Sequence, residues 1–549
     1  MQRLLTLMWI GVLIGATSAS ADESASVTAP QQEFDVWEWR VEGNSLLTNA
    51  DIERTLYPLL GAHQTIASVE NARRALEQRY RDLGYPTVLV DIPEQEVNSG
   101  VVALRVTEAR IERLRITGAR YYSSRDMSVT LRALAQGSVL YTTAVQEQLN
   151  GVNARSANRA VTPVLRPGKT PGTVEVELKV KDELPLHASL ELNDRSGSGT
   201  ARWRSIAMLR YDNLWQREHS IALQYQTAPE EPEQVRVYSG TYVARFNDTD
   251  NVLAAYGVHS SSSSAAIGDI SVIGNGDIYG LRAIVPFAAL PNYTHSASFG
   301  VDYKDFKENL RVLGQDNPLS TPINYATFTA QYTANLPAEK SSTRFNLGVN
   351  FGLRGVSDDT IACQRLALDI VGNKIIDSQP YSEFGCKRPG ARANYFYLRA
   401  GAEHNGEIFS GYTWRAALDM QISDSPLISN EQYSVGGADS VRGYYESQAL
   451  GDNGARATLE LSTPSFGTRW PDQIQELRAL VFSDAALLKI REAGAGEEDH
   501  IELSSAGIGV RFTAWGGLRG ALDWAQVFNA NGHVDSGDTH VHARVEYAF

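Results

Sequence analysis

The stretch THVHARVEYAF, residues 539–549, ends the chain and alternates strictly between two kinds of side chain. The apolar positions are Val541, Ala543, Val545, Tyr547 and Phe549. The intervening polar positions are His540, His542, Arg544 and Glu546. A period of two is that of a β-strand with one apolar and one polar face. A strand of a soluble sandwich would alternate in the same way, whereas a final aromatic residue better suits a strand between lipid and a polar lumen.

The same alternation recurs in segments of about ten residues from residue 184 to the end of the chain. Three clear examples are HASLELNDR (187–195), ARATLEL (455–461) and LRALVFSDA (477–485). Short connections such as WGG (515–517) alternate with long polar ones, among them 260–276, 355–391 and 433–454. We predict a mainly β fold over residues 184–549, a transmembrane antiparallel β-barrel of about 16 strands.

The N-terminal residues predict export. Arg3 precedes an apolar run over residues 4–15 and a small-residue site at Ala19-Ser20-Ala21. A run of this length is too short to span a bilayer as a helix and is typical of a signal peptide. We expect a signal peptide over residues 1–21. A short polar extension, residues 22–32, then follows and leaves too little room for a plug helix with a linker.

Composition argues against several functions. The net charge of −14 and the lack of a basic stripe give no support for a nucleic-acid partner. The only cysteines, Cys363 and Cys386, are too far apart for a CxxC pair, and no HExxH helix occurs. The ten histidines are scattered, and neither a GxSxG elbow nor a phosphate-binding GxxxxGK[ST] loop is present. We therefore expect no enzyme activity, no cofactor and no resident metal.

Residues 33–183 follow a different pattern. SVENARRALEQRYRDLGY (68–85) has apolar residues on one helical face, and Ser68 is the expected N-cap. Short strands surround this helix, in DVWEWRVEG, TVLVDIP and VVALRVTEA. The order strand, helix, helix, strand, strand then recurs. We predict two small soluble α/β modules, 33–108 and 109–183, between the signal peptide and the barrel.

Two such modules before a barrel resemble the polypeptide-transport-associated (POTRA) architecture. The match is close to the two-partner-secretion transporters, the haemolysin secretion/activation family. The first module carries residues of the family's signature: Tyr80, Gly84, Tyr85, Ile92, Pro93, Gln95 and Gly100. In the second module, LRPGKTPGTVEVELKV (165–180) is similar to the family's PG…PGT hairpin. The resemblance covers nearly the whole chain after the signal peptide.

The long stretch YSVGGADSVRGYYESQALGDNG (433–454) resembles the sixth extracellular loop of this family. Its tip motif is Val441, Arg442, Gly443 and Tyr444, and VFSDAA (481–486) resembles the barrel-wall motif that partners it, with Phe482 and Asp484. The family usually has Gly where this chain has Ala486, which puts close backbone approach there in doubt. An unpaired arginine in a poorly hydrated lumen is costly, so we expect Arg442 to pair with Asp484. The alternative is a solvated loop charge.

Two further sites follow from the barrel. Cys363 and Cys386 both fall in the connection 355–391, which strand counting places outside the cell, so we predict a disulfide between them. A pair of free thiols is the alternative. At the C-terminus, the resemblance implies that the aromatic strand with Tyr547 and Phe549 is read by the barrel-assembly machinery during insertion.

The resemblance implies an outer-membrane protein of a Gram-negative bacterium with its POTRA domains in the periplasm. These domains would recognise a large, unfolded partner exoprotein, and the barrel, set in outer-membrane lipid, would secrete it. That partner could be a haemolysin or an adhesin. The alternative is a factor that inserts other barrels, although such factors resemble longer POTRA arrays. A barrel enzyme would need a catalytic set that is not evident, and a simple porin would have no use for the soluble modules.

Overall fold

The computed structural model describes most of residues 33–549. The residues outside the description are 1–32, 98, 247–248, 263–264, 268–269, 273, 289, 291, 308–310, 313–314, 317–321, 355–359, 363–364, 369–373, 378–379, 471 and 495–497. The predicted signal peptide (1–21) and N-terminal extension (22–32) lie there. The chain divides into two units: the first ends at Lys181, and the second comprises residues 120–122 and 182–549.

The first α/β domain has a three-stranded sheet of order β2-β5-β4, in which β2 runs parallel to β5 and β4 runs antiparallel to it. Its elements are β1 (Phe34–Val36), β2 (Glu38–Glu42), α1 (Asn49–Leu56), η1 (Tyr57–Leu59), β3 (Gly61–Gln64), α2 (Ile66–Asp82), β4 (Val88–Asp91) and β5 (Val101–Glu108). Ala72, Leu76 and Tyr80 of α2 are buried against this sheet. The predicted helical face therefore forms the core.

Two local predictions in this domain were wrong. The helix α2 begins after Thr65, which is its N-cap, and not after Ser68. Ser68 is the third residue of the helix and accepts a hydrogen bond from the Thr65 amide in a capping box, so it is a partner of the cap. The stretch DVWEWRVEG forms two strands, because β1 leaves the sheet before Trp37 and pairs with β3.

The second α/β domain repeats the plan with the sheet order β6-β8-β7. Its elements are β6 (Arg110–Thr117), α3 (Ser124–Thr130), η2 (Arg132–Leu134), α4 (Thr142–Ala154), β7 (Arg159–Pro167) and β8 (Thr173–Asp182). Gly43 after β2 and Gly118 after β6 both have positive φ, and a Cβ on either would lie 2.3 Å from a main-chain oxygen of the neighbouring strand. The same steric need at the same point marks the two domains as repeats.

The two α/β domains contact each other through the glycine–tyrosine pair of the first. The Gly84 oxygen accepts a hydrogen bond of 2.9 Å from the Thr142 amide, and the Tyr85 and Tyr141 rings lie 5.3 Å apart. Gly84 has a φ of +92°, and a Cβ there would lie 2.9 Å from the Tyr141 ring. A side chain at this position would therefore displace one domain from the other.

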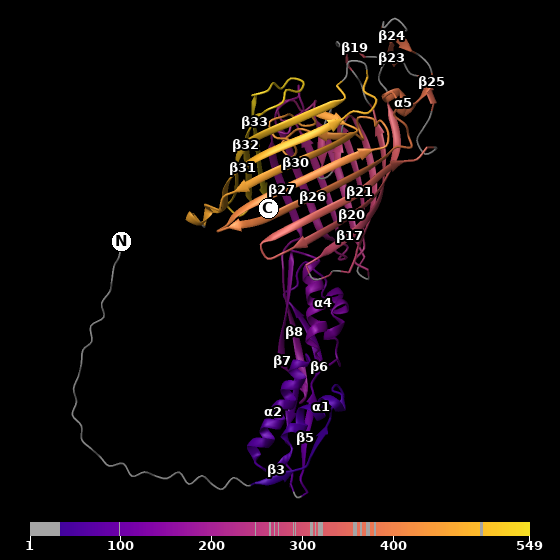
Figure 1. Ribbon diagram of the computed structural model, residues 1–549. Coiled ribbons are helices and arrows are strands. Elements are labelled where there is room, and N and C mark those ends of the chain that lie inside the picture. Colours follow the sequence, from indigo (N-terminus) through magenta and orange to yellow (C-terminus); the bar gives the residue numbers. More distant parts are fainter. Residues whose placement is uncertain are drawn as a thin grey trace, which may run out of the picture. The chain divides into compact units, whose positions relative to one another are not determined.

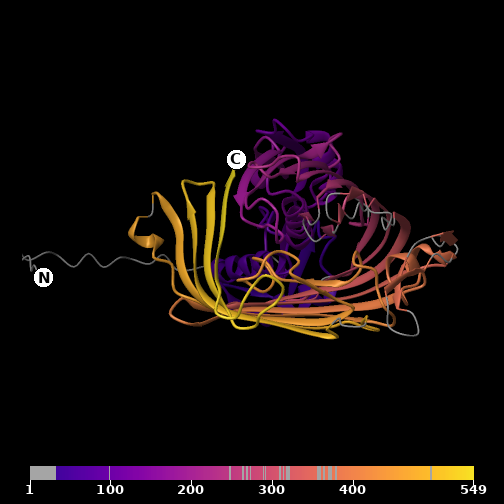
Figure 2. The same cartoon turned by 90° about the horizontal axis from the view of Figure 1, so that it is seen from above.

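The second unit is a closed antiparallel barrel of sixteen strands, as predicted (Figures 1 and 2). The strands are β9 (Leu186–Asn193), β10 (Arg204–Leu214), β11 (His219–Thr227), β12 (Arg236–Arg245), β13 (Val252–Ser261), β16 (Gly276–Pro286), β17 (Thr294–Phe306), β20 (Ile323–Pro337), β21 (Ser341–Gly352), β26 (Phe396–Phe409), β27 (Tyr412–Ser423), β30 (Asn453–Ser462), β31 (Ile474–Lys489), β32 (His500–Ala514), β33 (Leu518–Val527) and β34 (Thr539–Ala548).

The barrel wall is apolar outside and polar inside. Along β9, Leu190 and Leu192 are exposed, whereas Ser189 before them and Asn193 after them are buried. The same alternation holds along β34, where Val541, Val545 and Tyr547 are exposed and His542 is buried. An exposed apolar outer surface of this kind suits contact with lipid. Separately, none of the helices in the described part of the chain is long and apolar enough to cross a membrane.

Smaller elements lie in the connections between barrel strands. They are β14 (Ala265–Ile267), β15 (Ile270–Val272), β18 (Arg311–Val312), β19 (Gln315–Asp316), β22 (Thr360–Ala362), β23 (Arg365–Leu368), β24 (Lys374–Asp377), β25 (Pro380–Ser382), α5 (Glu383–Lys387), β28 (Tyr433–Val435), β29 (Ala449–Gly451) and η3 (Gly467–Arg469). The strands β28 and β29 pair within residues 424–452, the connection from β27 to β30. This connection, the lumen loop below, carries the predicted tip motif.

Candidate functional site: the lumen loop and the barrel wall

The tip of the lumen loop is buried against inward-facing side chains of the barrel wall. Val441 and Tyr444 are 0 % exposed and Arg442 is 3 % exposed. Gly443 has a φ of +98°, and a Cβ added to it would lie 2.8 Å from the Val527 side chain. The glycine therefore gives the tip both its left-handed backbone and its close approach to β33.

Arg442 pairs with Asp484 of β31. The Arg442 Nε and Nη2 atoms donate to the two carboxylate oxygens at 2.7 and 2.9 Å, and the Arg442 amide donates to Oδ2 at 3.2 Å. The guanidinium carbon lies 3.4 Å from the centre of the Phe482 ring, which adds a cation–π contact. Bidentate bonds between two buried charges are among the strong hydrogen bonds of proteins, so this contact fixes the tip in one position.

Further acidic groups surround the same arginine. Its Nη1 atom lies 2.8 Å from Glu460 of β30 and 4.0 Å from Asp523 of β33. Asp523 is in turn bound by both terminal nitrogens of Arg511, at 2.7 and 2.8 Å. The tip arginine thus lies in an acidic pocket on the wall, and its removal would leave Asp484 and Glu460 without this counter-charge.

Two other tip residues are held by the segment after β33 and by β34. The Tyr444 hydroxyl donates to the Asn529 carbonyl at 2.8 Å, and its ring packs in an apolar cluster with Val441, Ala486 and Val527. The buried alanine fills the position where the family usually has Gly, and β31 runs past the tip without a break there. The Gly443 amide donates to His542 Nε2 of β34 at 2.9 Å.

The start of the loop is anchored by a residue that the sequence analysis missed. Glu431 is 1 % exposed and lies 2.5 Å from Lys304 Nζ. The hydroxyls of Tyr325 and Tyr397 donate to its two oxygens at 2.6 and 2.8 Å. No motif marks Glu431, because its partners come from β17, β20 and β26, far away in the sequence.

The end of the loop has a second anchor that was also missed. Asp452 is fully buried, and Arg388 donates to both of its oxygens at 2.6 and 2.8 Å. The amides of Leu427 and Arg491 donate to the same carboxylate at 2.8 and 2.7 Å. One side chain therefore ties together the exit of the lumen loop, its entrance, the segment after α5 and the end of β31.

Between tip and exit, Glu446 is half-buried beside its own loop. Its carboxylate accepts a hydrogen bond of 3.0 Å from the Ala438 amide. Burial raises the pKa of Glu446 to about 7, against the opposing charge of Arg195 and with help from the nearby Asp439. A glutamic acid in this place therefore changes its charge near neutral pH.

The remaining predicted residues lie elsewhere. The rings of Tyr547 and Phe549 are exposed on the outer face, 6.0 Å apart. The main chain of Phe549 exchanges two hydrogen bonds of 3.0 Å with Ala188 of β9, so the last residue helps to close the barrel. Cys386 is buried in α5, whereas Cys363 lies outside the described residues, and the disulfide between them stays a prediction.

Comparison with known proteins identifies the family. The family model for haemolysin secretion/activation protein ShlB/FhaC/HecB matches residues 172–512, more than half of the chain. The model for the ShlB-type POTRA domain matches residues 34–109, the first α/β domain.

Individual relatives are distant. The outer membrane transporter CdiB of Dickeya dadantii is 21 % identical over 78 % of this chain and 72 % of its own length. The heme/hemopexin transporter protein HuxB of Haemophilus influenzae is 20 % identical over 90 % of this chain and 83 % of its own. CdiB of Escherichia coli is 24 % identical, but that match spans only 32 % of its length and 35 % of this chain.

Two solved structures share the fold. CdiB from Escherichia coli has a TM-score of 0.59 at 18 % identity and covers 96 % of this chain and 93 % of its own. BamA from Haemophilus ducreyi lacking POTRA domains 1–3 has a TM-score of 0.56 at 14 % identity and covers 94 % and 100 %. These two likenesses show the fold alone. With the family model matching the barrel and the POTRA model matching the first domain, the chain belongs to the haemolysin secretion/activation (ShlB/FhaC/HecB) family of outer-membrane transporters.

Proposed function

We propose that this protein is the transporter of a two-partner secretion system. Its α/β domains bind a large, unfolded partner exoprotein in the periplasm, and its barrel passes that chain outward. The barrel remains in outer-membrane lipid throughout, and the release of the lumen loop opens the path. Energy comes from outside the chain, and folding of the exported partner at the cell surface supplies it.

The observation that carries the proposal is the free edge of β2. In the sheet order β2-β5-β4, β2 pairs only with β5 in the described part of the chain. In the second domain only the start of β6 has a covered outer edge, where Ile111 exchanges main-chain hydrogen bonds of 2.9 and 2.8 Å with Ser138 and Gly137, much as β3 covers β1 in the first domain. An uncovered strand edge can receive an extended segment by strand addition, and main-chain bonds of this kind bind an unfolded chain with little sequence demand.

The lumen loop fits this role as the closing element. A loop held by a few buried charge pairs has two defined states, since each pair is either made or broken. A porin needs neither this arrangement nor the soluble domains. The proposed partner is a large exported protein with an N-terminal signal and long β-helix repeats, encoded in a neighbouring reading frame.

A photo-crosslinking residue tests the free edge directly. We place it at Arg40 of β2, whose side chain is 57 % exposed, and as a control at Arg54 of α1, which is 75 % exposed. During secretion the partner should crosslink to position 40 and not to position 54. Equal crosslinking at both positions would remove the basis for strand addition.

Deletion of residues 33–183 tests whether the α/β domains bind the partner while the barrel alone forms the channel. The barrel strands bond to one another, so the remaining chain should still insert and conduct ions in planar bilayers, while no partner appears in the medium. If the partner is still secreted, recognition lies in the barrel. If loss of the whole protein instead depletes unrelated outer-membrane barrels, the protein is a barrel-insertion factor, the alternative that shares this fold.

A further inference from the structure

The barrel closes where its first strand, β9, meets its last strand, β34. This seam has five register pairs, from Arg544↔Asn193 to Ala548↔Ser189, whereas β31 and β32 share fifteen. Phe549 and Ala188 extend the seam at one end. At the other end Asp194 continues it, because its amide donates to the Ala543 carbonyl at 3.1 Å and its Oδ1 accepts from the Ala543 amide at 2.9 Å.

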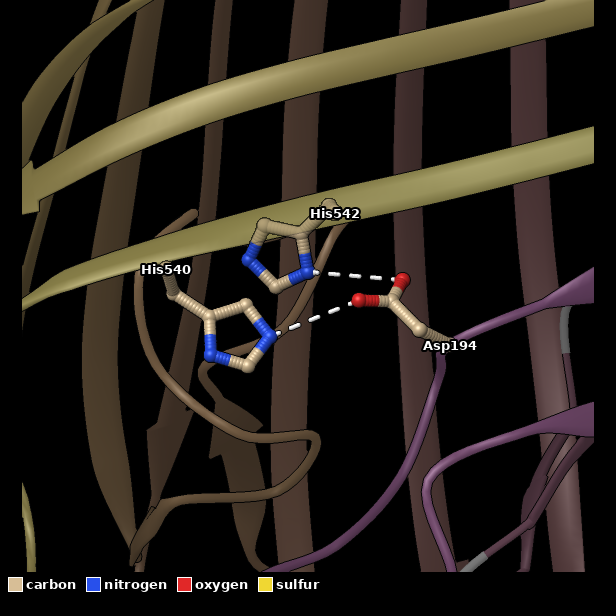
Figure 3. A group of neighbouring side chains, drawn as sticks. All are labelled: Asp194, His540 and His542. Carbon is tan, nitrogen blue, oxygen red and sulfur yellow. Dashed lines mark ion pairs between the residues drawn. The ribbon is translucent and has the colours of Figure 1, made fainter.

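Two histidines of β34 face this aspartate (Figure 3). His540 Nε2 lies 3.4 Å from Asp194 Oδ2, and His542 Nδ1 lies 3.8 Å from Oδ1. They are two residues apart on one strand, so both side chains point to the same, inward face. The His540 and His542 rings lie 4.5 Å apart, and the three side chains offer ligand atoms within 4.8 Å of one another.

Hydrogen bonding does not account for this cluster. Asp194 Oδ2 and His542 Nδ1 are buried, and within the described part of the chain neither has a hydrogen-bond partner. Both histidine–carboxylate distances exceed the roughly 2.7–3.2 Å of an ordinary N–H···O bond. Arg202 lies 3.8 Å from Asp194 Oδ2, but its side chain is 53 % exposed and it supplies only a partial counter-charge. Asp194 Oδ2 faces His540 Nε2, and His542 Nδ1 faces Asp194 Oδ1, so each of the two buried atoms lies beside another potential ligand atom without an ordinary hydrogen bond and leaves room for a shared ligand.

The donor set selects the ligand. Two imidazole nitrogens and one carboxylate oxygen suit Zn²⁺, Co²⁺ or Ni²⁺, whereas Mg²⁺ and Ca²⁺ prefer oxygen alone. Ligands at the Zn–N and Zn–O distances of about 2.0–2.2 Å in a tetrahedron lie roughly 3.4 Å from one another. His540 Nε2 lies 3.4 Å from Oδ2, His542 Nδ1 lies 3.8 Å from Oδ1, and one ligand atom from each of the three residues lies within 4.8 Å of the others, so small side-chain rotations bring them to this spacing. The Ala543 amide already orients the carboxylate, as outer partners of metal ligands do.

We propose that Asp194, His540 and His542 bind a divalent transition-metal ion, with Zn²⁺ as the first candidate and water at the fourth position. The ion joins the end of the first strand to the last strand and so fastens the seam. The site was absent from the sequence expectations because Asp194 meets the histidines only when the barrel closes.

The site is coupled to the lumen loop through His542. Its Nε2 accepts the Gly443 amide hydrogen, so in the neutral ring the proton is on Nδ1, the atom that faces Asp194. A metal bound at Nδ1 moves that proton to Nε2, where it meets the Gly443 N–H. Binding of the ion therefore costs the tip one hydrogen bond, and by reciprocity an undocked tip favours the ion.

Metal titration of the purified mature protein tests the site. The protein is kept folded in detergent, freed of any histidine tag and stripped with chelator. Zn²⁺ is titrated by calorimetry, and Co²⁺ by its visible absorption, which is intense in tetrahedral sites. We expect one ion per chain. His540→Ala, His542→Ala and Asp194→Asn should each weaken binding at least ten-fold, whereas Arg442→Ala, which undocks the tip, should strengthen it roughly five-fold, the factor expected for one net hydrogen bond.

His259→Ala is the matched control, because His259 Nδ1 lies 2.7 Å from Asp277 in a barrel-wall pair without a second histidine in the cluster. It should leave binding unchanged. Asp194→Asn keeps an oxygen for the Ala543 amide, and heat-modifiable migration verifies that each variant is folded. Absence of stoichiometric binding to the folded wild type, or equal binding in the three ligand variants, would overturn the site. Unchanged affinity in Arg442→Ala would overturn its coupling to the loop.

Discussion

Two arginine–aspartate pairs with buried carboxylates hold the lumen loop, and they differ in what else the carboxylate binds. Asp452 accepts from two main-chain amides and from Gln432 as well as from Arg388. The described contacts of Asp484 all come from one residue, Arg442, and the arginine itself has a second partner in Glu460.

The two ion pairs therefore differ in function. We call the Arg388–Asp452 pair a joint, because it holds the loop permanently, and the Arg442–Asp484 pair a latch, because it can open. The Asp452 pair can break only if several main-chain groups lose their partner at the same time, and each buried unpaired group is costly. The Arg442 pair breaks when one side chain moves. We infer that the root of the loop remains fixed while the tip is the part that moves.

The largest effect is expected for Asp452→Ala. Loss of one partner of a buried pair costs on the order of 3–5 kcal/mol, and the orphaned amides add to it. The temperature at which the Asp452→Ala barrel converts to its unfolded band on a gel should fall, and secretion should be lost as well. Arg392→Ala is the control, since it removes an arginine–aspartate pair, with Asp424 at 2.9 Å, where both side chains are substantially exposed, and leaves the hydrogen bonds of Asp424 to the Phe396 amide and the Ser425 hydroxyl in place. If the Asp452→Ala variant unfolds at the same temperature as the wild type, the Asp452 pair is not a structural joint and the proposed difference between the two pairs is wrong.

The next effect concerns the latch. Arg442→Ala and Asp484→Ala should each impair secretion, because a tip that cannot dock stays unordered in the lumen and obstructs the path that its ordered release opens. The pair is of the same order, about 3–5 kcal/mol before hydration of the lumen reduces it. The barrel should still assemble, in contrast to Asp452→Ala. Secretion and folded barrel are measured for both single variants and the double variant. The double defect should equal a single one, because the second change removes a contact already lost. Additive defects would mean that Arg442 acts on some other group.

A smaller effect is expected from pH. The pKa of Glu446 is about 7 in the docked loop, above the ordinary value of 4.5. Docking is therefore favoured below about pH 4.5, weakens as pH rises toward 7, and is constant above that, with a total change of up to roughly 3 kcal/mol. Hydrogen exchange of the tip should be faster at pH 8 than at pH 5.5 after correction for intrinsic rates. Glu446→Gln should remove that dependence, and a dependence that survives in this variant would assign it to another group.

The smallest effect is expected for Glu460→Gln. Glu460 is the second partner of Arg442, at 2.8 Å, and its side chain is 15 % exposed. Glutamine keeps an acceptor for the guanidinium, so the loss should be about 1 kcal/mol. Secretion should fall only slightly, and the Arg442–Asp484 coupling should persist. A secretion defect as large as that of Asp484→Ala would mean that Glu460 of β30, and not Asp484, is the main partner of Arg442.

The wall of the barrel could be predicted from the sequence because each strand lies between two media. Leu190 and Leu192 face outward and Asn193 faces inward as their chemistry requires, and sixteen repetitions of this pattern leave little ambiguity. The contact of Arg442 with Asp484 was predicted from a motif resemblance together with strand parity. The start of α2 was misplaced by three residues because Thr65 and Ser68 are both good capping residues.

The anchors of the loop could not be predicted in this way. Glu431, Arg388 and Asp452 lie in irregular segments without a period, and their partners are set by the closed ring of strands. Asp194 and His542 are 348 residues apart in the sequence and meet only across the seam. Such contacts depend on how the closed barrel brings distant strands together, and the alternation of residues along a single strand carries no information about this.

The fixed root has a consequence for how fast the pore can close again. Arg442 lies eleven residues after Glu431 and ten before Asp452, so even a fully extended tip stays within roughly 35 Å of its anchors. A short tether of this kind keeps the effective concentration of the tip at its pocket in the range of about 1 mM or more. Re-docking of the tip is then a first-order process, so its rate constant does not depend on how much of the protein the membrane contains. Once the lumen is empty, the rate of closure is set by how often the tethered tip meets its pocket on the wall.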